Sequence, residues 1–148
     1  MKRASKIITM KRKVFAVVLG VIAAVVVIIA IEALGHSLYP LPAGMDVTDT
    51  EAMNAYVMTL PVTALLIVMA AWIVATLVGG LLACIIARET PLIYSAIIGG
   101  LVLLGTIINL MSLPHPLWFS FTAVLAIIAT IFITGRIGST FVSTTAVD

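Results

Sequence analysis

The sequence has 148 residues, of which 63% are hydrophobic and only 9% are charged, and its formal net charge is +2. A water-soluble domain usually carries about 25% charged residues, so this composition excludes an ordinary soluble fold and indicates that lipid surrounds the protein. The single cysteine, Cys84, excludes an intrachain disulfide, a C-x-x-C redox pair and a cysteine-rich zinc site.

Four segments are long and apolar enough to cross a membrane. A hydrocarbon core of about 30 Å requires a helix of roughly 20 mostly apolar residues. The segments that meet this requirement are residues 14–34, 61–87, 92–111 and 117–134. We therefore predict an all-α membrane protein, a bundle of four transmembrane helices within residues 14–136.

The first apolar segment follows a basic start, a combination that also begins secretory signal peptides. Its apolar run is longer than the roughly 7–15 residues of a signal peptide's hydrophobic region. No A-x-A-like cleavage site follows the run either. We therefore predict that residues 14–34 form a retained transmembrane helix.

Basic residues lie on only one side of the predicted bundle. With the N-terminus inside, all of them fall on the cytoplasmic side: Lys2, Arg3, Lys6, Lys11, Arg12, Lys13, Arg88 and Arg136. The two opposite loops, residues 35–60 and 112–116, contain neither Lys nor Arg. Lys and Arg near a membrane are retained on its cytoplasmic face. This asymmetry predicts a multi-pass protein of a bacterial cytoplasmic membrane with both chain ends inside.

The two ends of the chain are predicted to lie outside the membrane domain. Residues 1–13 form a basic cytoplasmic segment, which can attract anionic lipid and gives no indication of nucleic-acid binding. Residues 137–148 are polar and are predicted to form a loose cytoplasmic tail.

The longer outer loop is predicted to contain a short helix on the outer surface. The stretch "YPLPAG", residues 39–44, ends the first helix because proline lacks a backbone donor and restricts its predecessor. Thr48 and Glu51 have the spacing of a capping box, and Asp49 suits a helix N-terminus. We expect a helix to begin near Asp49, with these acids acting as caps in preference to a cation site.

Small residues mark the faces on which the predicted helices pack. Small side chains let two helix backbones approach closely, which drives helix association in lipid. The second span carries a row at every fourth position, and the first and third spans carry glycines of the same kind. The predicted packing residues are Gly20, Ala71, Ala75, Gly79, Ala83 and Gly100. They are expected to hold together either this bundle or an oligomer.

Four polar residues are predicted to lie at one outer level: Glu32, His36, Asn109 and His115. Glu32 and His36 are four residues apart, so they share a helix face if the helix persists through Gly35. Imidazoles and a carboxylate suit a divalent transition metal, and histidine also suits a proton acceptor or pH sensor. The structural alternative is a polar helix end, where polar groups cost less than at mid-membrane. We retain the four as candidate ligand- or ion-binding residues and assign no metal and no cofactor.

The sequence contains no pattern of a known catalytic centre. A nucleophile elbow, an HExxH motif, a P-loop and a dinucleotide fingerprint are all missing from it. No charged residue lies near the middle of a predicted span, which argues against a proton-coupled transporter. We therefore expect a protein that is not an enzyme.

The stretches "GHSLYPLPAGMD", "TLP", "GGLLACIIAR" and "PHPLW" together resemble an uncharacterised family of small four-span bacterial membrane proteins. The resemblance covers residues 14 to about 136; it implies the span count and no activity. We expect a non-enzymatic accessory or packing partner of other membrane proteins, as a homo-oligomer or within a larger complex. The alternative is a small oligomeric transporter or channel with an outer-face site around Glu32, His36 and His115.

Overall fold

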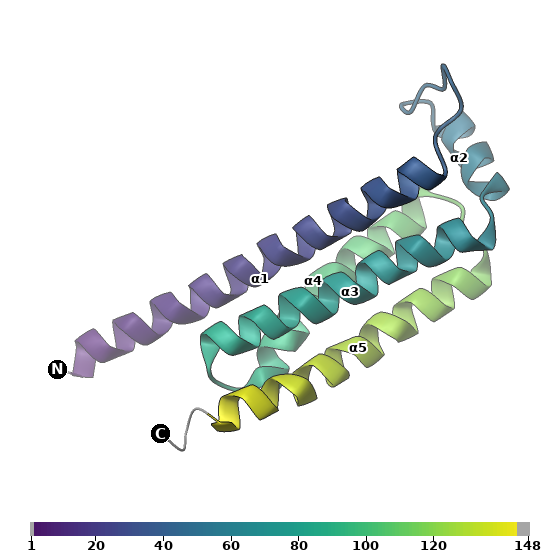
Figure 1. Cartoon of the computed structure of the whole chain (residues 1–148). Helices are drawn as coiled ribbons and strands as arrows, with labels where there is room; N and C mark the ends of the chain where they lie inside the picture. The colour runs from purple at the N-terminus through teal and green to yellow at the C-terminus, as the bar shows by residue number, and fades with distance from the viewer. Residues whose placement is uncertain (1, 145–148) are drawn as a thin grey trace.

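The computed structural model describes residues 2–144 and the side chains of residues 9–142. Within residues 2–144 the chain forms five helices and no strand: α1 (Lys2–Leu38), α2 (Thr50–Thr59), α3 (Val62–Ala87), α4 (Pro91–Ser112) and α5 (Leu117–Thr144). The four long helices run alongside one another, and the short α2 lies at one end of them (Figure 1). Each long helix is long and apolar enough to span a membrane, which confirms the predicted all-α, four-span fold.

Helix α1 is longer than the span predicted for it. It is continuous over 37 residues, about 55 Å at 1.5 Å per residue, so it extends beyond a hydrocarbon core. It takes in the basic segment up to residue 13 and the first residues of the predicted outer loop. The side chains of Lys2, Arg3 and Lys6 lie outside the described part of the structure.

The prediction of a loose tail from residue 137 is wrong for residues 137–144, because α5 continues to Thr144. The hydroxyls of Ser139 and Thr140 donate to carbonyls three residues earlier in the same helix, so these polar side chains are compatible with it. Gly138 is buried, and a Cβ on it would lie 3.0 Å from the Cβ of Cys84. Packing on α3 therefore extends past the predicted end. The last residues, 145–148, lie outside the described residues.

Helix α1 packs on α3 through two facing glycines. A Cβ on Gly20 would lie 2.8 Å from the carbonyl oxygen of Gly79, and one on Gly79 would lie 2.5 Å from the carbonyl oxygen of Gly20. Neither position has room for a side chain, so the backbones are in direct contact, as small residues permit in membranes. The other members of the predicted row on α3 are fully buried as well: Ala71, Ala75 and Ala83.

On α4 the packing glycine is Gly99, not Gly100. A Cβ on Gly99 would lie 2.7 Å from Cδ1 of Ile131, whereas a Cβ on Gly100 would meet nothing within 4 Å. The expectation that Gly100 packs within this bundle is therefore wrong. Consecutive residues of a helix point about 100° apart, so a one-residue error in the predicted row moves it to the outer face.

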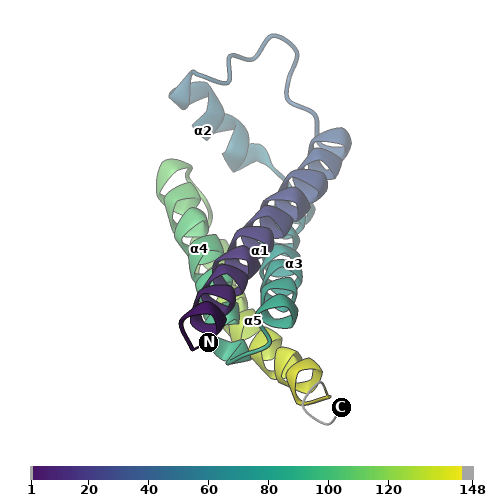
Figure 2. The same cartoon turned by 90° about the vertical axis from the view of Figure 1, so that its left-hand side faces the viewer.

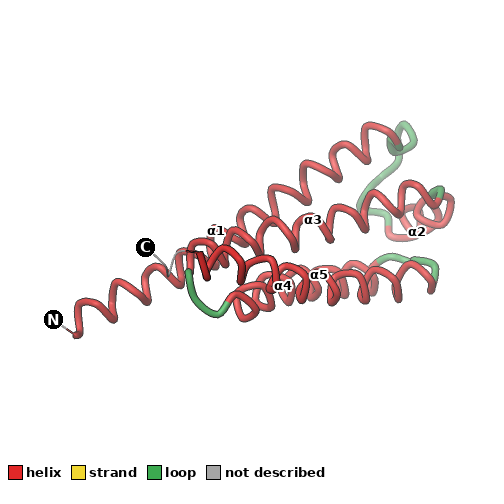
Figure 3. Tube along the Cα trace, turned by 60° about the horizontal axis from the view of Figure 1, so that its bottom comes forward, coloured by secondary structure: helices red, strands yellow, loops and turns green. Residues whose placement is uncertain are grey.

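The helices do not contribute equally to the bundle. Helix α3 contacts the other three long helices, and α4 and α5 also contact each other. Among the described residues α1 lies mainly against α3, touches α4 only slightly and makes no contact with α5. Figures 2 and 3 show α1 and α4 diverging toward the end of the bundle that carries α2. The fold is a packed trio, α3–α4–α5, with α1 laid along α3.

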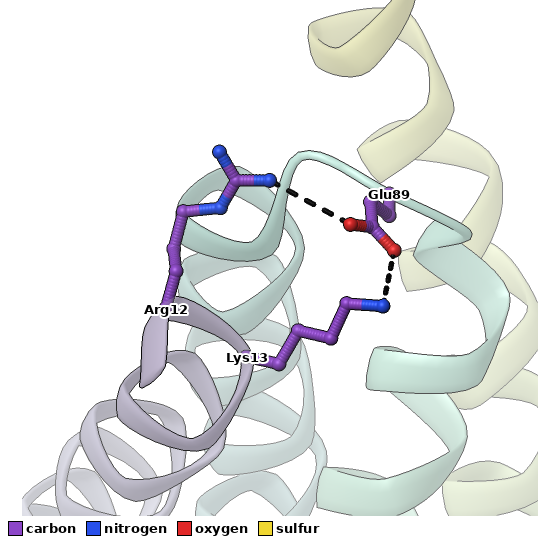
Figure 4. A network of polar contacts seen from close by, with 3 residues as sticks. All are labelled: Arg12, Lys13 and Glu89. Carbon is purple, nitrogen blue, oxygen red and sulfur yellow. Dashed lines mark ion pairs between the residues drawn. The ribbon is translucent and has the colours of Figure 1, made fainter. Parts of the chain in front are cut away.

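Two basic side chains of α1 hold the turn between α3 and α4. The Lys13 Nζ lies 2.7 Å from Oε2 of Glu89, and the Arg12 Nη2 lies 3.6 Å from Oε1 of the same residue (Figure 4). These ion pairs fix the basic end of α1 close to the start of α4. Binding of anionic lipid at this segment stays a prediction, since two of its basic side chains already have an acidic partner within the chain.

Replacing Glu89 with glutamine should loosen this end of α1 without unfolding the protein. The three side chains are between 33% and 42% exposed, and such ion pairs contribute less than about 1 kcal/mol. We expect little change in the unfolding midpoint and faster hydrogen exchange of backbone amides in the first turns of α1. Raising the salt concentration should produce the same acceleration in the unmodified protein and little further change in the variant.

Helix α2 begins with a side-chain cap at Asp49. One carboxylate oxygen of Asp49 accepts hydrogen bonds from the amides of Glu51 and Ala52, at 2.9 and 3.2 Å. This confirms the predicted start of the helix. The proposed capping box from Thr48 is wrong, because the Thr48 hydroxyl donates to Asp46 instead, at 2.7 Å.

Replacing Asp49 with alanine should destabilise α2 by about 1 kcal/mol, since two amides of the first turn lose their acceptor. Hydrogen exchange of the α2 amides should accelerate by about fivefold, which is the factor that corresponds to this free energy. Alanine at Thr50, the exposed first residue of the helix, is the control and should leave the exchange rates nearly unchanged. Equal rates in both variants would show that Asp49 does not cap the helix.

The turn before α2 should respond to pH through Asp46. The hydroxyl and the amide of Thr48 both donate to its carboxylate, at 2.7 and 2.8 Å, and lower the pKa of Asp46 below its ordinary value of 3.8. Because the pKa of Asp46 is lowered in the folded protein, its carboxylate stabilises the turn at pH values above the ordinary pKa. This stabilisation is lost as the pH falls through the lowered pKa. In an NMR titration, the Thr48 amide shift should therefore change with a midpoint below 3.8.

Candidate functional site

A cleft of about 280 Å³ lies at the end of the bundle that carries α2. Helices α1, α2, α3 and α4 and the turn before α5 all contribute to its lining. The lining residues belong to the end of the bundle toward which α1 and α4 diverge and at which α2 lies; Figure 2 shows this arrangement of the helices. All four predicted site residues, Glu32, His36, Asn109 and His115, line it. The structure thus brings together side chains from three separate parts of the chain; what they bind stays a prediction.

Glu32 and His36 reach the cleft from one face of α1, because the helix continues through Gly35 to Leu38. Gly35 keeps α1 close to α3 here, since a Cβ on it would lie 3.2 Å from Cγ2 of Ile67. Among the described residues, neither Glu32 nor His36 has a hydrogen-bond or ion-pair partner. Glu32 therefore brings to the wall of the cleft a carboxylate with no hydrogen-bond or ion-pair partner among the described residues, one helical turn from the His36 imidazole.

Asn109 contributes an unpaired acceptor from α4. Its side-chain oxygen, Oδ1, is buried and has no hydrogen-bond partner among the described residues. A buried polar atom left without a partner costs about 1–3 kcal/mol, so it favours any occupant of the cleft that carries a donor.

His115 is held in place by the turn before α5. Its Nδ1 lies 2.9 Å from the carbonyl oxygen of Leu113, the residue that follows α4. A carbonyl only accepts, so this hydrogen bond places the proton on Nδ1 and leaves Nε2 of the neutral ring as an acceptor. The ring also stacks on the fully buried Phe119, with centroids 5.0 Å apart. His115 thus satisfies a helix end and still offers an acceptor.

The four residues share a cleft, but their arrangement gives no support to a metal site. Among the described residues no three His, Cys, Asp or Glu side chains lie close enough together to hold a metal ion. The interpretation of the two histidines and Glu32 as ligands of a transition metal is therefore not supported. The site offers hydrogen-bond acceptors and one carboxylate at the edge of an apolar cavity.

Two tyrosines that the sequence did not single out complete the cleft. The Tyr39 hydroxyl shares a hydrogen bond with the Thr63 hydroxyl at 2.6 Å, and the Tyr56 hydroxyl donates to the Tyr39 carbonyl at 3.2 Å. The first bond connects the residue that follows α1 to the start of α3, and the second connects α2 to that same residue. A signal for α2 was present, because its cleft-lining residues follow the i, i+3, i+4 pattern of one helix face. They are Met53, Tyr56 and Val57, and Leu60 follows directly after the helix.

The chain matches no family model, and no curated protein and no solved structure matches it. The resemblance to an uncharacterised family of four-span bacterial membrane proteins therefore stays a prediction. What the fold establishes is an integral membrane protein with four membrane-spanning helices.

Proposed function

We propose that this protein is a non-enzymatic accessory protein of a bacterial cytoplasmic membrane, and that a transmembrane helix of a partner protein packs into the seam between α1 and α4. The observation that carries the proposal is the open seam itself. Helix α1 touches α4 only slightly, and 17% of the residues in its most apolar 18-residue stretch are buried, against 44% for α3. Helix α1 therefore offers most of its surface to something other than its own bundle.

The inner part of the seam is an apolar groove of about 340 Å³. Val14 and Val18 line it from α1, and Ile93 and Ile97 line it from α4. All four residues are between 39% and 62% exposed, so they remain available for contact. Because lipid tails are as apolar as these residues, a groove of this kind favours a helix only where backbones can also approach closely.

Helix α4 carries small residues beside the groove, where the backbone of a second helix could approach closely. Ile93, Ala96, Ile97 and Gly100 are spaced at i, i+3, i+4 and i+7, so they share one face of the helix. Ala96 and Gly100 are exposed small residues four apart, the arrangement that lets two membrane helices pack closely. Gly100, which does not pack within the bundle, lies where an incoming helix would contact it.

Site-specific photo-crosslinking in native membranes tests the proposal. A photoreactive residue at Val18 or Ile97 should give discrete protein adducts, whereas one at Ile133, an exposed position on α5, should give none. Leucine at Gly100 should abolish the adducts, and leucine at Gly105, which also has open space but lies on another face, should preserve them. A stable monomer that gives the same faint background from all three photoreactive positions would contradict the accessory role.

One observation favours the alternative function, a small oligomeric transporter: Glu32, His36 and His115 line one cleft. Transport by a lone chain is opposed by the contact of Gly20 with Gly79, which leaves no room between α1 and α3. An oligomer would have to supply the remaining path. Flux through liposomes that is lost with Glu32→Ala or His36→Ala would favour this alternative, and absence of flux at every protein density would eliminate it.

A further inference from the structure

In the outer cleft, which is the cleft that Glu32, His36, Asn109 and His115 line, the polar atoms without partners are predominantly acceptors. Both tyrosine hydroxyls are engaged, and the Nδ1 proton of His115 is used by the Leu113 carbonyl. The acceptors that remain include the carboxylate of Glu32, the buried Oδ1 of Asn109 and Nε2 of His115, and the unpaired His36 imidazole adds one acceptor and one donor when neutral. An occupant that satisfies this set must bring hydrogen-bond donors.

The charges around the cleft favour a cation. No Lys or Arg lines the cleft. Between Lys13 and Arg88 the charged residues of the chain are all acidic: Glu32, Asp46, Asp49 and Glu51. A surface of one sign raises the local concentration of oppositely charged molecules, and a carboxylate in the wall disfavours an anion.

The rest of the lining is apolar, and the size of the cavity limits what fits. Leu65 and Val68 of α3, Val57 of α2 and Leu113 after α4 form much of the wall. A volume of about 280 Å³ lies at the lower end of the range for small-molecule sites, so it suits a small molecule and not a whole lipid.

We propose that the outer cleft binds a small amphipathic amine, with its protonated amino group between Glu32 and Asn109 and its apolar part against the wall formed by α2 and α3. The ammonium donates to the carboxylate of Glu32 and to the orphaned amide oxygen of Asn109, neither of which has a partner among the described residues. This inference stands independently of the proposed accessory role, because the cleft and the α1–α4 groove lie at opposite ends of α1.

The test measures equilibrium binding of tritiated n-octylamine to the full chain in phosphatidylcholine nanodiscs, with empty nanodiscs subtracted. We expect saturable binding that weakens about tenfold or more in Glu32→Gln, because a charge-assisted hydrogen bond becomes a neutral one. A second variant, Asn109→Leu, should weaken binding several-fold while removing the unpaired polar atom from the bundle. Glu51→Gln, which changes an exposed acid outside the cleft, should stay within twofold of the unmodified protein.

Octanoate and n-octanol have the same chain length as octylamine. Comparing their binding with that of octylamine separates the effect of the charged amino group from partitioning of the apolar chain. Octanoate should show no saturable binding, and octanol should bind more weakly than octylamine by about tenfold or more, the ratio expected for a charge-assisted hydrogen bond. The proposal is overturned if Glu32→Gln binds octylamine as tightly as the unmodified protein. It is also overturned if octanoate binds equally well, or if no saturable binding exceeds that of empty nanodiscs.

A protonated amine next to an apolar chain also occurs in a lipid headgroup, and one arm of the experiment separates the two sources. Nanodiscs that contain phosphatidylethanolamine should weaken octylamine binding if headgroup amines enter the cleft. Unchanged affinity assigns the cleft to free amphipathic amines. In either case binding must weaken in Glu32→Gln, so either result supports an amine as the occupant.

Discussion

Replacing Gly79 with leucine should lower the free energy of unfolding by about 3 kcal/mol, because the new side chain has no space to occupy. A Cβ at this position would lie 2.5 Å from the carbonyl oxygen of Gly20 and 2.9 Å from the Cβ of Ala24, and neither atom belongs to a flexible side chain. Helix α1 would have to separate from α3, its main contact. The change is measured as the unfolding midpoint in mixed micelles titrated with SDS and followed by circular dichroism.

The matched control is Gly100→Leu, at a glycine with open space around it. Leucine is the better helix former by roughly 0.5–1 kcal/mol, so this variant should be no less stable than the unmodified protein. It should nevertheless lose the crosslinked adducts at the α1–α4 seam, which separates an assembly role of Gly100 from a folding role. Equal losses of stability in the two leucine variants would contradict the placement of α1 on α3.

Replacing Phe119 with alanine should cost about 3 kcal/mol, the lower end of the range for deleting a buried aromatic ring. The low end applies because the surroundings of the bundle are lipid and not water. Removing the Phe119 ring therefore costs packing contacts, without the added cost of losing burial from water. Phe119 is fully buried and lies against the rings of His115, Trp72 and Trp118. Loss of near-ultraviolet circular dichroism from the two tryptophans should accompany the lower unfolding midpoint.

Phe121→Ala is the control on the same helix, because this ring is 69% exposed. Its removal should change the free energy of unfolding by less than about 1 kcal/mol. If both alanine variants were equally stable, Phe119 would not be the packed support beneath His115.

The spans and their order were predictable because they depend on local properties. A helix that crosses lipid must be apolar over a minimum length, and Lys and Arg mark its inner end. The cap at Asp49 was predictable for the same reason, since it depends on neighbours two and three residues away. The tail was not, because residues 137–144 stay helical partly through packing of Gly138 against α3, a contact distant in sequence.

That the four candidate residues lie at one end of the bundle was predictable, but the shape of the cleft was not. Glu32, His36, Asn109 and His115 lie near helix ends that an alternating order of spans places at the same end of the bundle. Whether they face one another depends on how α1 crosses α3 and diverges from α4 (Figure 2), which the contact of Gly20 with Gly79 determines. A pattern of small residues shows that a close contact exists, but not which helix supplies the partner. The same limitation made Gly100 and Gly99 indistinguishable in sequence.

The ion pair of Glu89 was missed for a related reason. Its position in a tight turn indicated only a hairpin, and its partners, Arg12 and Lys13, come from a helix more than seventy residues earlier. A basic segment next to a membrane predicts attraction to anionic lipid on local grounds. Tertiary structure supplied an acidic partner within the chain instead.

The most direct test of this account is which side of the membrane each end of the bundle faces, since the outer cleft depends on it. In a Cys84→Ala background, a cysteine at Val47, exposed in the loop before α2, should react with a membrane-impermeant maleimide in intact cells. A cysteine at Ser139, near the end of α5, should react only after the membrane is permeabilised. Labelling of Ser139→Cys in intact cells, with Val47→Cys protected, would reverse the topology and contradict an outward-facing cleft.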